Sequence, residues 1–385
     1  MSHLLLNVTF ASVWSKVWPI IVAILFFGLI ITIHEFGHFI TAKLFKVKVN
    51  EFAIGMGPAI FKKKKGETTY ALRLFPVGGY VSMEGEDEAS EDERAFCNKK
   101  VWQKFIIVAA GAIMNLILGF IFVAILTCQS DLISTTYVRN FYDNSVSSQF
   151  GLEAGDKITE INGTKIFSTT DISYSFGRSA DEIQKIKVTK DGKETEINAK
   201  PFDITVKRNG EKKELKNVYF ETYEKDGQTI IIYDFVVIGV DKTFGNVIKA
   251  TFRDSVSYAR LVWLSLFDLV TGHYGLNDLS GPVGTVTLVA DTISDAAQSA
   301  ASGGKVDLSS IYIIMAFISI NIGIFNLMPI PALDGGRLFF LIIEAIRRKP
   351  IPAKYEGLVH AIGLVLLLLL MVVISFNDIL KLIKG

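Results

Sequence analysis

Four long apolar runs dominate the hydrophobic pattern of the chain. They cover residues 17–39, 105–127, 311–328 and 358–376. A helix needs about 20 residues to cross the hydrocarbon core of a bilayer, so each run is a candidate span. The first run ends in His and Glu and not in the small residues that precede a signal-peptide cleavage site. The pattern therefore predicts a polytopic α-helical membrane protein with about four transmembrane helices.

Between the first two runs, hydrophobicity alternates with a period of two residues. Residues 67–84 (ETTYALRLFPVGGYVSME) alternate apolar and polar positions, and Pro76, Gly78 and Gly79 supply a turn or bulge. This alternation predicts a β-hairpin associated with the membrane.

The longer stretch between the second and third runs has the composition of a soluble domain. We expect residues 130–242 to form a mostly β module with at least one helix. Strand-like alternation occurs at residues 185–190, 204–207, 218–223 and 229–232. Residues 244–271 are amphipathic but carry too many charges for a span, which predicts a helix lying at the outer membrane interface. Residues 291–310 are rich in Ser, Ala and Gly and predict a loop.

These patterns divide the chain into four parts. Residues 1–128 form an N-terminal membrane half, and residues 130–242 form the β module. Residues 243–310 hold the interfacial segment and the loop, and residues 311–385 form a C-terminal membrane half. Lysine and arginine gather between the first two runs and between the last two, which predicts that both segments face the cytoplasm. The β module then lies outside the cytoplasm.

Composition narrows the possible functions. The chain is 50% hydrophobic and 21% charged, and its net charge of +1 offers no basic field for a nucleic acid. Cys97 and Cys128 occur in no metal-binding spacing, so we interpret them as structural or incidental.

The chemistry-bearing motif lies at the end of the first apolar run. Residues 34–38 read His-Glu-Phe-Gly-His, and residues at positions i and i+4 of a helix share a face. His34 and His38 can therefore bind one ion, for which zinc is suited, while Glu35 can take a proton from metal-bound water. A chance match is the alternative, but ionisable residues at membrane depth are costly and usually functional.

A third ligand is expected from the end of the third run. Residues 326–336 read NLMPIPALDGG, in which two prolines break the helix and Asp334 carries the carboxylate. Non-helical backbone at membrane depth is tolerated where protein or a water-filled cavity surrounds it. We expect Asp334 to complete the metal site, and the alternative is that it caps the following helix.

Two amides lie within the apolar runs. Asn115 follows Gly111 with GxxxN spacing, and Asn326 opens the proline-rich peptide. Either amide could hold substrate backbone or make an interhelical hydrogen bond worth about 1 kcal/mol or less. His273 and His360 lie in no motif, and we interpret them as surface or interface histidines.

Taken together, these motifs resemble the site-2 protease family, and most closely its bacterial branch of zinc metalloproteases like the regulator of sigma-E protease. The resemblance rests on HEFGH, GAIMN and NLMPIPALDGG in this order, with FPVGGYV and residues 279–284 (LSGPVG) as further matches. It implies that His34, His38 and Asp334 bind Zn²⁺, that Glu35 is the catalytic acid and base, and that Asn326 lies in or beside the substrate cleft.

The β module is similar to a PDZ domain. The resemblance rests on residues 145–148, 151–158 and 161–163 and on VIGV at 237–240, which is similar to a carboxylate-binding strand. It implies that Ile238 and Gly239 contact a bound peptide by strand addition. A module that only blocks access to the site is the alternative. The family's best-studied members carry two such domains, whereas this chain has room for one.

The resemblance also implies a reaction and a location. The expected activity is hydrolysis of peptide bonds within or near transmembrane segments of other proteins, such as anti-sigma factors or remnant signal peptides. The expected location is the bacterial plasma membrane, with the lipid bilayer and single-span proteins as partners and no nucleic acid. A binding scaffold and an ion transporter are the alternatives, although an intact Glu35 disfavours the first and the lack of an inverted repeat disfavours the second.

Overall fold

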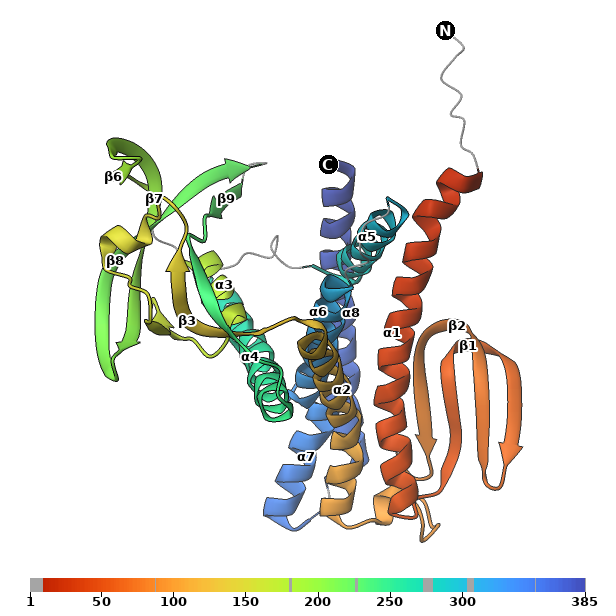
Figure 1. Ribbon diagram of the computed structural model, residues 1–385. Helices are drawn as coiled ribbons and strands as arrows, with labels where there is room; N and C mark the ends of the chain where they lie inside the picture. Colours follow the sequence, from red (N-terminus) through yellow and green to blue (C-terminus); the bar gives the residue numbers. More distant parts are fainter. Residues whose placement is uncertain are drawn as a thin grey trace. The chain divides into compact units, whose positions relative to one another are not determined.

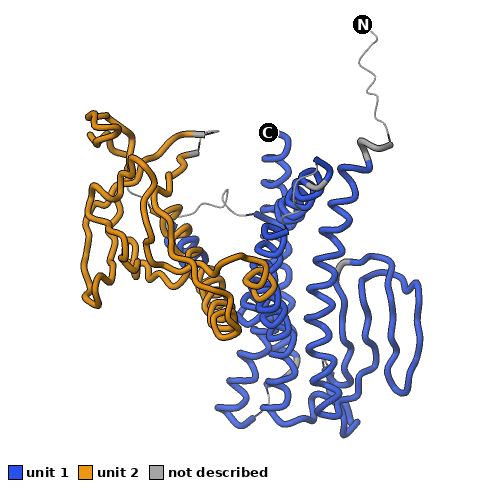
Figure 2. Tube along the Cα trace, in the orientation of Figure 1, with its two compact units in different colours: residues 1–122, 265–385 blue, residues 123–264 orange. Residues whose placement is uncertain are grey.

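The computed structural model describes residues 10–86, 88–179, 182–225, 228–272, 280–302, 308–349 and 351–384 (Figure 1). The chain divides into two compact units (Figure 2). One, here called the membrane unit, comprises Met1–Phe122 and Ser265–Gly385. The other, here called the β unit, comprises Val123–Leu264. His273, and Leu279 of the LSGPVG match, lie outside the described residues.

Within the described part of the chain, four helices are long and apolar enough to cross a membrane. They are α1 (Phe10–Leu44), α2 (Val101–Gln129), α6 (Ser309–Leu327) and α8 (Ala353–Lys384). Each corresponds to one of the four apolar runs, so the described residues confirm the predicted number of spans and the chain is a multi-pass membrane protein. A helix satisfies its backbone hydrogen bonds internally, which is the condition for crossing hydrocarbon.

Small residues bring the spans into close contact. A Cβ atom on Gly37 of α1 would lie 2.7 Å from the carbonyl carbon of Ala110 in α2. A Cβ atom on Gly323 of α6 would lie 3.0 Å from the carbonyl oxygen of Ala112, also in α2. Lipid tails are as apolar as the helices, so close van der Waals packing through small residues provides much of the association.

A strand pair follows α1. β1 (Val49–Lys65) pairs antiparallel with β2 (Thr68–Met83), and the chain turns between them at Gly66. The register is irregular, and Ala53 is paired with both Tyr80 and Ala71. The prediction placed both strands within residues 67–84 and is wrong on this point. Residues 49–65 contain two glycines and a proline, which obscured the first strand in the sequence.

The segment after α4 (Phe244–Val270) contains a helix that the sequence pattern did not predict. α5 spans Pro282–Ala301, so the predicted loop over residues 291–310 is wrong for its first half. The carboxylate of Asp378 in α8 accepts hydrogen bonds from the backbone N–H groups of Gly281 (3.0 Å) and Gly284 (2.8 Å). A buried side chain from a distant helix therefore stabilises the start of α5, and no local sequence pattern reports such a contact.

The β unit is built on one sheet, with one short helix packed against it and most of α4 in the same unit. Its eight strands have the order β10-β3-β4-β7-β8-β9, with β5 beside β4 and β6 beside β7. The elements are β3 (Ile133–Phe141), η2 (Ser147–Phe150), β4 (Lys157–Ile161), β5 (Thr164–Lys165), α3 (Thr169–Arg178), β6 (Gln184–Lys190), β7 (Lys193–Arg208), β8 (Glu211–Lys225), β9 (Gln228–Ile231) and β10 (Phe235–Val240). All four stretches of predicted alternation overlap one of these strands.

The core of the β unit is aromatic. Phe176 of α3 contacts Phe202 of β7 and Phe220 of β8, with ring centroids 4.6 and 4.7 Å apart. All three side chains are almost fully buried. Aromatic groups bury a large apolar area each, which lets a modest sheet and one helix form a stable core.

Most of helix α4 belongs to the β unit, and polar contacts join it to α3. Arg260 forms an ion pair with the buried Asp171 of α3 (2.7 Å), and Ser257 donates a hydrogen bond to the same carboxylate (3.0 Å). The helix also exposes apolar side chains at helical spacing, namely Phe244, Ile248, Phe252, Val256 and Trp263. The predicted amphipathic helix is thus present.

Candidate metal centre

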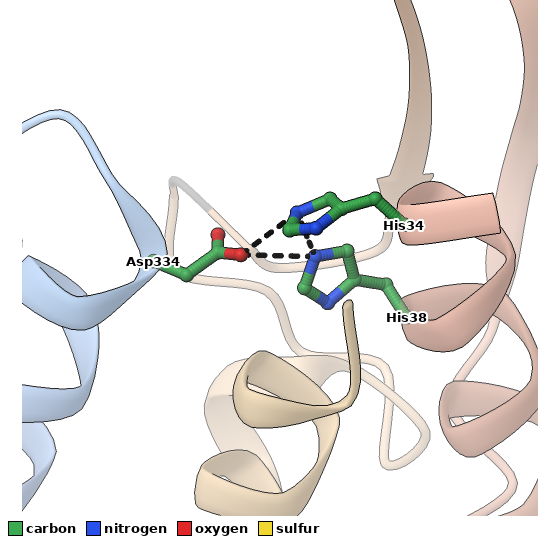
Figure 3. Close-up of side chains that lie close together, drawn as sticks. All are labelled: His34, His38 and Asp334. Carbon is green, nitrogen blue, oxygen red and sulfur yellow. Dashed lines mark hydrogen bonds and ion pairs between the residues drawn. The ribbon is translucent and has the colours of Figure 1, made fainter. Parts of the chain in front are cut away.

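Helix α1 presents two imidazole rings to one point. His34 and His38 lie one turn apart and both are buried, and their Nε2 atoms are 3.2 Å from each other. The rings are inclined at 79°, so they converge edge to face and do not stack (Figure 3). The i, i+4 spacing of the motif produces this convergence directly.

Asp334 reaches the same point from the other membrane half. α6 ends at Leu327, residues 328–333 are not helical, and α7 (Asp334–Arg347) begins with Asp334. The Oδ2 atom of Asp334 lies 2.9 Å from Nε2 of His34 and 3.2 Å from Nε2 of His38 (Figure 3). The positive end of the α7 dipole favours a carboxylate at this position.

The position of α7 is fixed by a shared core near the site. Leu338 and Leu341 of α7 are buried with Val49 of β1, Val81 of β2 and Ile107 of α2. An ion pair between Lys104 of α2 and Glu344 of α7 (3.5 Å) adds a polar link. The residues that carry Asp334 are therefore held against the residues that carry the histidines.

The ligand atoms of His34, His38 and Asp334 all lie within 4.8 Å of one another, so this group could hold a metal ion. Tetrahedral zinc, with bonds of about 2.0–2.1 Å, requires neighbouring ligand atoms to be about 3.3 Å apart. The three observed separations of 2.9, 3.2 and 3.2 Å are close to this value. The donor set of two imidazoles and one carboxylate also fits catalytic zinc.

The hydrogen bonding of His38 reinforces this interpretation. Its Nδ1 atom lies 2.8 Å from the carbonyl oxygen of Ile107, which can only accept, so Nδ1 carries the proton. In the neutral ring, Nε2 is then a bare lone pair directed at the carboxylate of Asp334. Two acceptors at 3.2 Å repel each other unless a cation lies between them.

Gly111 and Asn115 of α2 complete the surroundings of the histidines. A Cβ atom on Gly111 would lie 2.7 Å from Cε1 of His38 and 2.8 Å from Cε1 of His34, so only glycine leaves room for the rings. Nδ2 of Asn115 lies 3.3 Å from Nδ1 of His34, and Oδ1 is buried without a hydrogen-bond partner. Rotating the amide by half a turn would let Oδ1 accept from Nδ1 and leave Nε2 of His34 as a ligand.

A cavity of about 410 Å³ is lined by two of the three side chains, those of His38 and Asp334. Glu35 lines it together with His38 and Asp334, and Tyr80, Val81 and Met83 of β2 form another part of its wall. An ion pair between Arg337 of α7 and Glu86 also borders the cavity.

The charge of Asp334 depends on two opposing effects. Burial opposes ionisation of this carboxyl, but its contacts with the imidazoles of His34 and His38 outweigh this effect and hold its pKa below the usual range. A cation between the same atoms would act in the same direction, because it too favours the ionised carboxylate. Asp334 is therefore an anionic ligand at neutral pH.

The structure does not bring all of the expected site residues together. Asn326, half-buried on the last turn of α6, donates a hydrogen bond to the carbonyl of Ile322 (3.0 Å) and is not among the residues that line the cavity. Asn115 is fully buried and contacts His34, so it faces the ligand and not the cavity. Ile238 and Gly239 lie on β10 in the β unit.

One residue of the site was overlooked in the sequence. His360 of α8 lines the cavity, and its Nδ1 atom accepts a hydrogen bond from the backbone N–H of Ala332 (3.0 Å). His360 was interpreted as a surface or interface histidine, and the structure places it at the contact between α8 and the peptide that carries Asp334. Its position inside an apolar run was the available signal, because ionisable residues within a span are rarely incidental.

A HExxH helix and an aspartate from a second membrane segment, converging beside a cavity, are typical of a membrane-embedded metallopeptidase. Comparison with known proteins is consistent with that class, since residues 22–370 match the model of Peptidase family M50. The chain belongs to this family, and it is a zinc metalloprotease of the site-2 protease type.

Several bacterial relatives are similar along almost their whole length. A zinc metalloprotease of Clostridium acetobutylicum is 36% identical over 363 residues, which cover 94% of this chain and 97% of the relative. A zinc metalloprotease of Fusobacterium nucleatum is 34% identical over 373 residues, covering 94% and 98%. The regulator of sigma-W protease RasP of Bacillus subtilis is 32% identical over 445 residues, covering 94% and 98%.

Proposed function

We propose that this protein hydrolyses peptide bonds within or near the transmembrane segments of other membrane proteins. The observation that carries the proposal is the convergence of His34, His38 and Asp334 beside a cavity lined by Glu35. His34 and His38 belong to a helix long and apolar enough to span a membrane. A peptide bond cleaved there therefore belongs to a substrate that is itself in the membrane.

In this proposal His34, His38 and Asp334 hold zinc, and Glu35 is the catalytic acid and base. Zinc held by these three residues would polarise a scissile carbonyl and lower the pKa of a water molecule, which would supply a nucleophile near neutral pH. Glu35 accepts the proton of the attacking water and returns it to the leaving amine. Its position in the cavity wall gives it access to both groups.

A substrate helix must unwind before its carbonyl groups become accessible. The end of β2 is suited to hold such an extended segment, because Tyr80, Val81 and Met83 line the cavity and the strand is paired with β1 through its other edge. An added strand would gain main-chain hydrogen bonds there. Val81→Pro and Ser82→Pro each remove one backbone N–H group of β2, and the two groups point to opposite edges of the strand. Unchanged cleavage by both variants would reject strand addition.

The β unit has a separate role in the proposal as a PDZ-like module. β10 ends the order of the sheet, so within the described strands it pairs only with β3. The backbone around Ile238 and Gly239 is therefore placed to add a peptide strand, with the carbonyl of Ile238 already accepting a hydrogen bond from Thr135 (2.7 Å). Such a module would admit or exclude substrates according to the part that lies outside the membrane.

We further propose the plasma membrane of a bacterium as the location, with the catalytic site near the cytoplasmic side and the β unit on the opposite side. The lysine and arginine distribution supports this orientation. The exposed apolar face of α4 supports contact of that helix with the outer membrane interface. The name of the Bacillus subtilis relative supports substrates that control a sigma factor, and remnant signal peptides have the same single-span chemistry.

The decisive experiment uses the full-length protein in lipid vesicles with a synthetic single-span peptide that carries a fluorophore and a quencher on either side of a Gly-Pro step. For Glu35→Gln we expect at least about a hundredfold loss of cleavage, because the general base is removed. Zinc content should stay at the wild-type level, because Glu35 is not a proposed ligand. Glu88→Gln, an exposed site, is the matched control and should cleave normally.

Two outcomes would contradict the proposal. Cleavage that persists in Glu35→Gln would exclude the assigned mechanism. Zinc that is retained by Asp334→Ala with unchanged affinity would exclude the assigned ligand set. A binding scaffold, in contrast, would hold zinc and a partner protein but show no cleavage in any variant.

A further inference from the structure

The peptide that carries Asp334 is held by a side chain from a different helix. Residues 328–333 connect α6 to α7 without regular structure. The N–H of Ala332, within this connection, donates a hydrogen bond to Nδ1 of His360 in α8 at 3.0 Å. A ring nitrogen of one span is therefore bonded to the backbone that leads directly into the third ligand.

Ala332 has a backbone conformation that needs support. Its φ is +75°, in the left-handed region, which a residue with a Cβ atom adopts at a cost. Such conformations persist where the surrounding structure holds them, and they are concentrated at functional sites. Ala332 is two residues before Asp334, so a change in its dihedral angles would displace the carboxylate directly.

The contact between α8 and this peptide is also close-packed. A Cβ atom on Gly363 would lie 2.9 Å from the carbonyl carbon of Pro331. A Cβ atom on Gly336 would lie 3.1 Å from Cε1 of His360. The ring of His360 also lies near Phe340 of α7, at 5.8 Å between ring centroids. Elsewhere α8 is the least buried of the candidate spans, with 6% of its most apolar window buried.

From these contacts we propose that His360 is a positioning residue for the third metal ligand. By accepting the Ala332 N–H it fixes the left-handed turn, and this places Oδ2 of Asp334 at 2.9 and 3.2 Å from the two imidazole nitrogens. The inference rests on the proposed function, because it assumes that His34, His38 and Asp334 form the metal site. It means that α8 stabilises residues 328–333, the segment that leads into Asp334.

The test measures metal binding by the full-length protein in detergent, without any substrate. Zinc dissociation constants are determined by competition with a chromogenic chelator for the wild type, His360→Ala and His360→Asn. Loss of a supporting partner commonly weakens metal binding by about 10- to 100-fold, so we expect about a tenfold increase for His360→Ala. His360→Asn should restore most of the affinity, because its Oδ1 can accept the same hydrogen bond.

A spectroscopic measurement separates positioning from general stability. Cobalt(II) is loaded in place of zinc, and its visible absorption bands report the arrangement of the ligands. We expect the bands of His360→Ala to shift and those of His360→Asn to match the wild type. Ile362→Ala is the matched control, since it removes an exposed side chain two residues along the same helix and should leave both measurements unchanged.

Failure of this inference can be distinguished from failure of the proposed function. If Asp334→Ala loses zinc but His360→Ala binds it like the wild type, only the positioning role is overturned. A His360→Ala variant that changes the KM for a peptide while zinc affinity is unchanged would assign His360 to the substrate and also overturn it. Reduced zinc affinity that His360→Asn does not restore would overturn it as well.

Discussion

A carboxylate in each unit lies away from bulk solvent, but the two have different surroundings: Asp171 is fully buried, and the side chain of Asp334 is 22% exposed. In the β unit, Asp171 accepts hydrogen bonds from the N–H groups of Phe167 (2.8 Å) and Ser168 (2.9 Å) as well as the contacts from Ser257 and Arg260. These partners are all donors, so the charge is satisfied within the protein. In the membrane unit, Asp334 faces the lone pair of His38 Nε2, so the neutral imidazole does not balance its charge.

The difference separates structural from chemical roles. A buried carboxylate surrounded by donors stabilises the fold, and Asp234 shows the same pattern with Val146 and Ser147. A half-buried carboxylate that faces imidazole lone pairs, as Asp334 does, is suited to share a metal cation with them. Asp378 shows that the distinction does not depend on the membrane, because it accepts two backbone N–H groups and is structural.

Removing the structural carboxylate should give the largest effect. Asp171→Ala removes the carboxylate that pairs with Arg260, and breaking a buried ion pair costs about 3–5 kcal/mol. We expect the free energy of local unfolding in the β unit to fall by that amount. Hydrogen–deuterium exchange of the full-length protein, resolved by peptide mass, measures it.

The same variant sharpens the comparison between the units. Zinc content of Asp171→Ala should equal that of the wild type, because none of the proposed ligands lies in the β unit. If Asp171→Ala released zinc, the distinction between a carboxylate that stabilises the fold and one that binds the metal would be contradicted.

A smaller effect, confined to the membrane unit, is expected for Gly111→Ala. The new methyl group would press on the rings of His34 and His38, and overpacking of this kind costs about 1–3 kcal/mol. We expect zinc affinity to fall by about 5- to 150-fold, the equivalent of that energy. Chelator competition measures it, and exchange in the β unit should not change.

The smallest effect is expected when a glycine of the β unit, Gly177, is replaced by alanine. A Cβ atom on Gly177 of α3 would meet no atom within 4 Å, and alanine is favoured over glycine in a helix by up to about 1 kcal/mol. Gly177→Ala should therefore leave zinc affinity unchanged and slow exchange in α3. Equal losses of zinc in Gly111→Ala and Gly177→Ala would show that the Gly111 effect is not steric.

The spans and the histidine motif could be predicted because they depend on local order. Apolar runs of sufficient length produce α1, α2, α6 and α8, and a four-residue spacing places His34 and His38 on one face. Asp334 could be nominated because prolines and glycines mark the end of a helix at membrane depth. The strand β1 was missed because its two glycines and its proline obscure the strand pattern. The helix α5 was missed because Asp378, which stabilises its start, lies almost 100 residues further along the chain.

The roles of the remaining site residues needed the tertiary structure. The residue type of Asn115 does not reveal whether its amide contacts a substrate or a histidine. Only the packing of α1 against α2 places it beside His34. His360 gives no local signal of its partner, because the N–H of Ala332 comes from 28 residues earlier in the chain.

The sequence by itself therefore determined the number of spans, the kind of metal ligands and the candidate catalytic carboxylate, since each follows from residue type and short spacing. Only the tertiary structure decided that Asp334 meets both imidazoles, that Gly111 leaves space for them and that α8 contacts residues 328–333, which lead into Asp334. These contacts join segments separated by tens to hundreds of residues. Their energies come from packing and hydrogen bonds that form only when the helices are assembled.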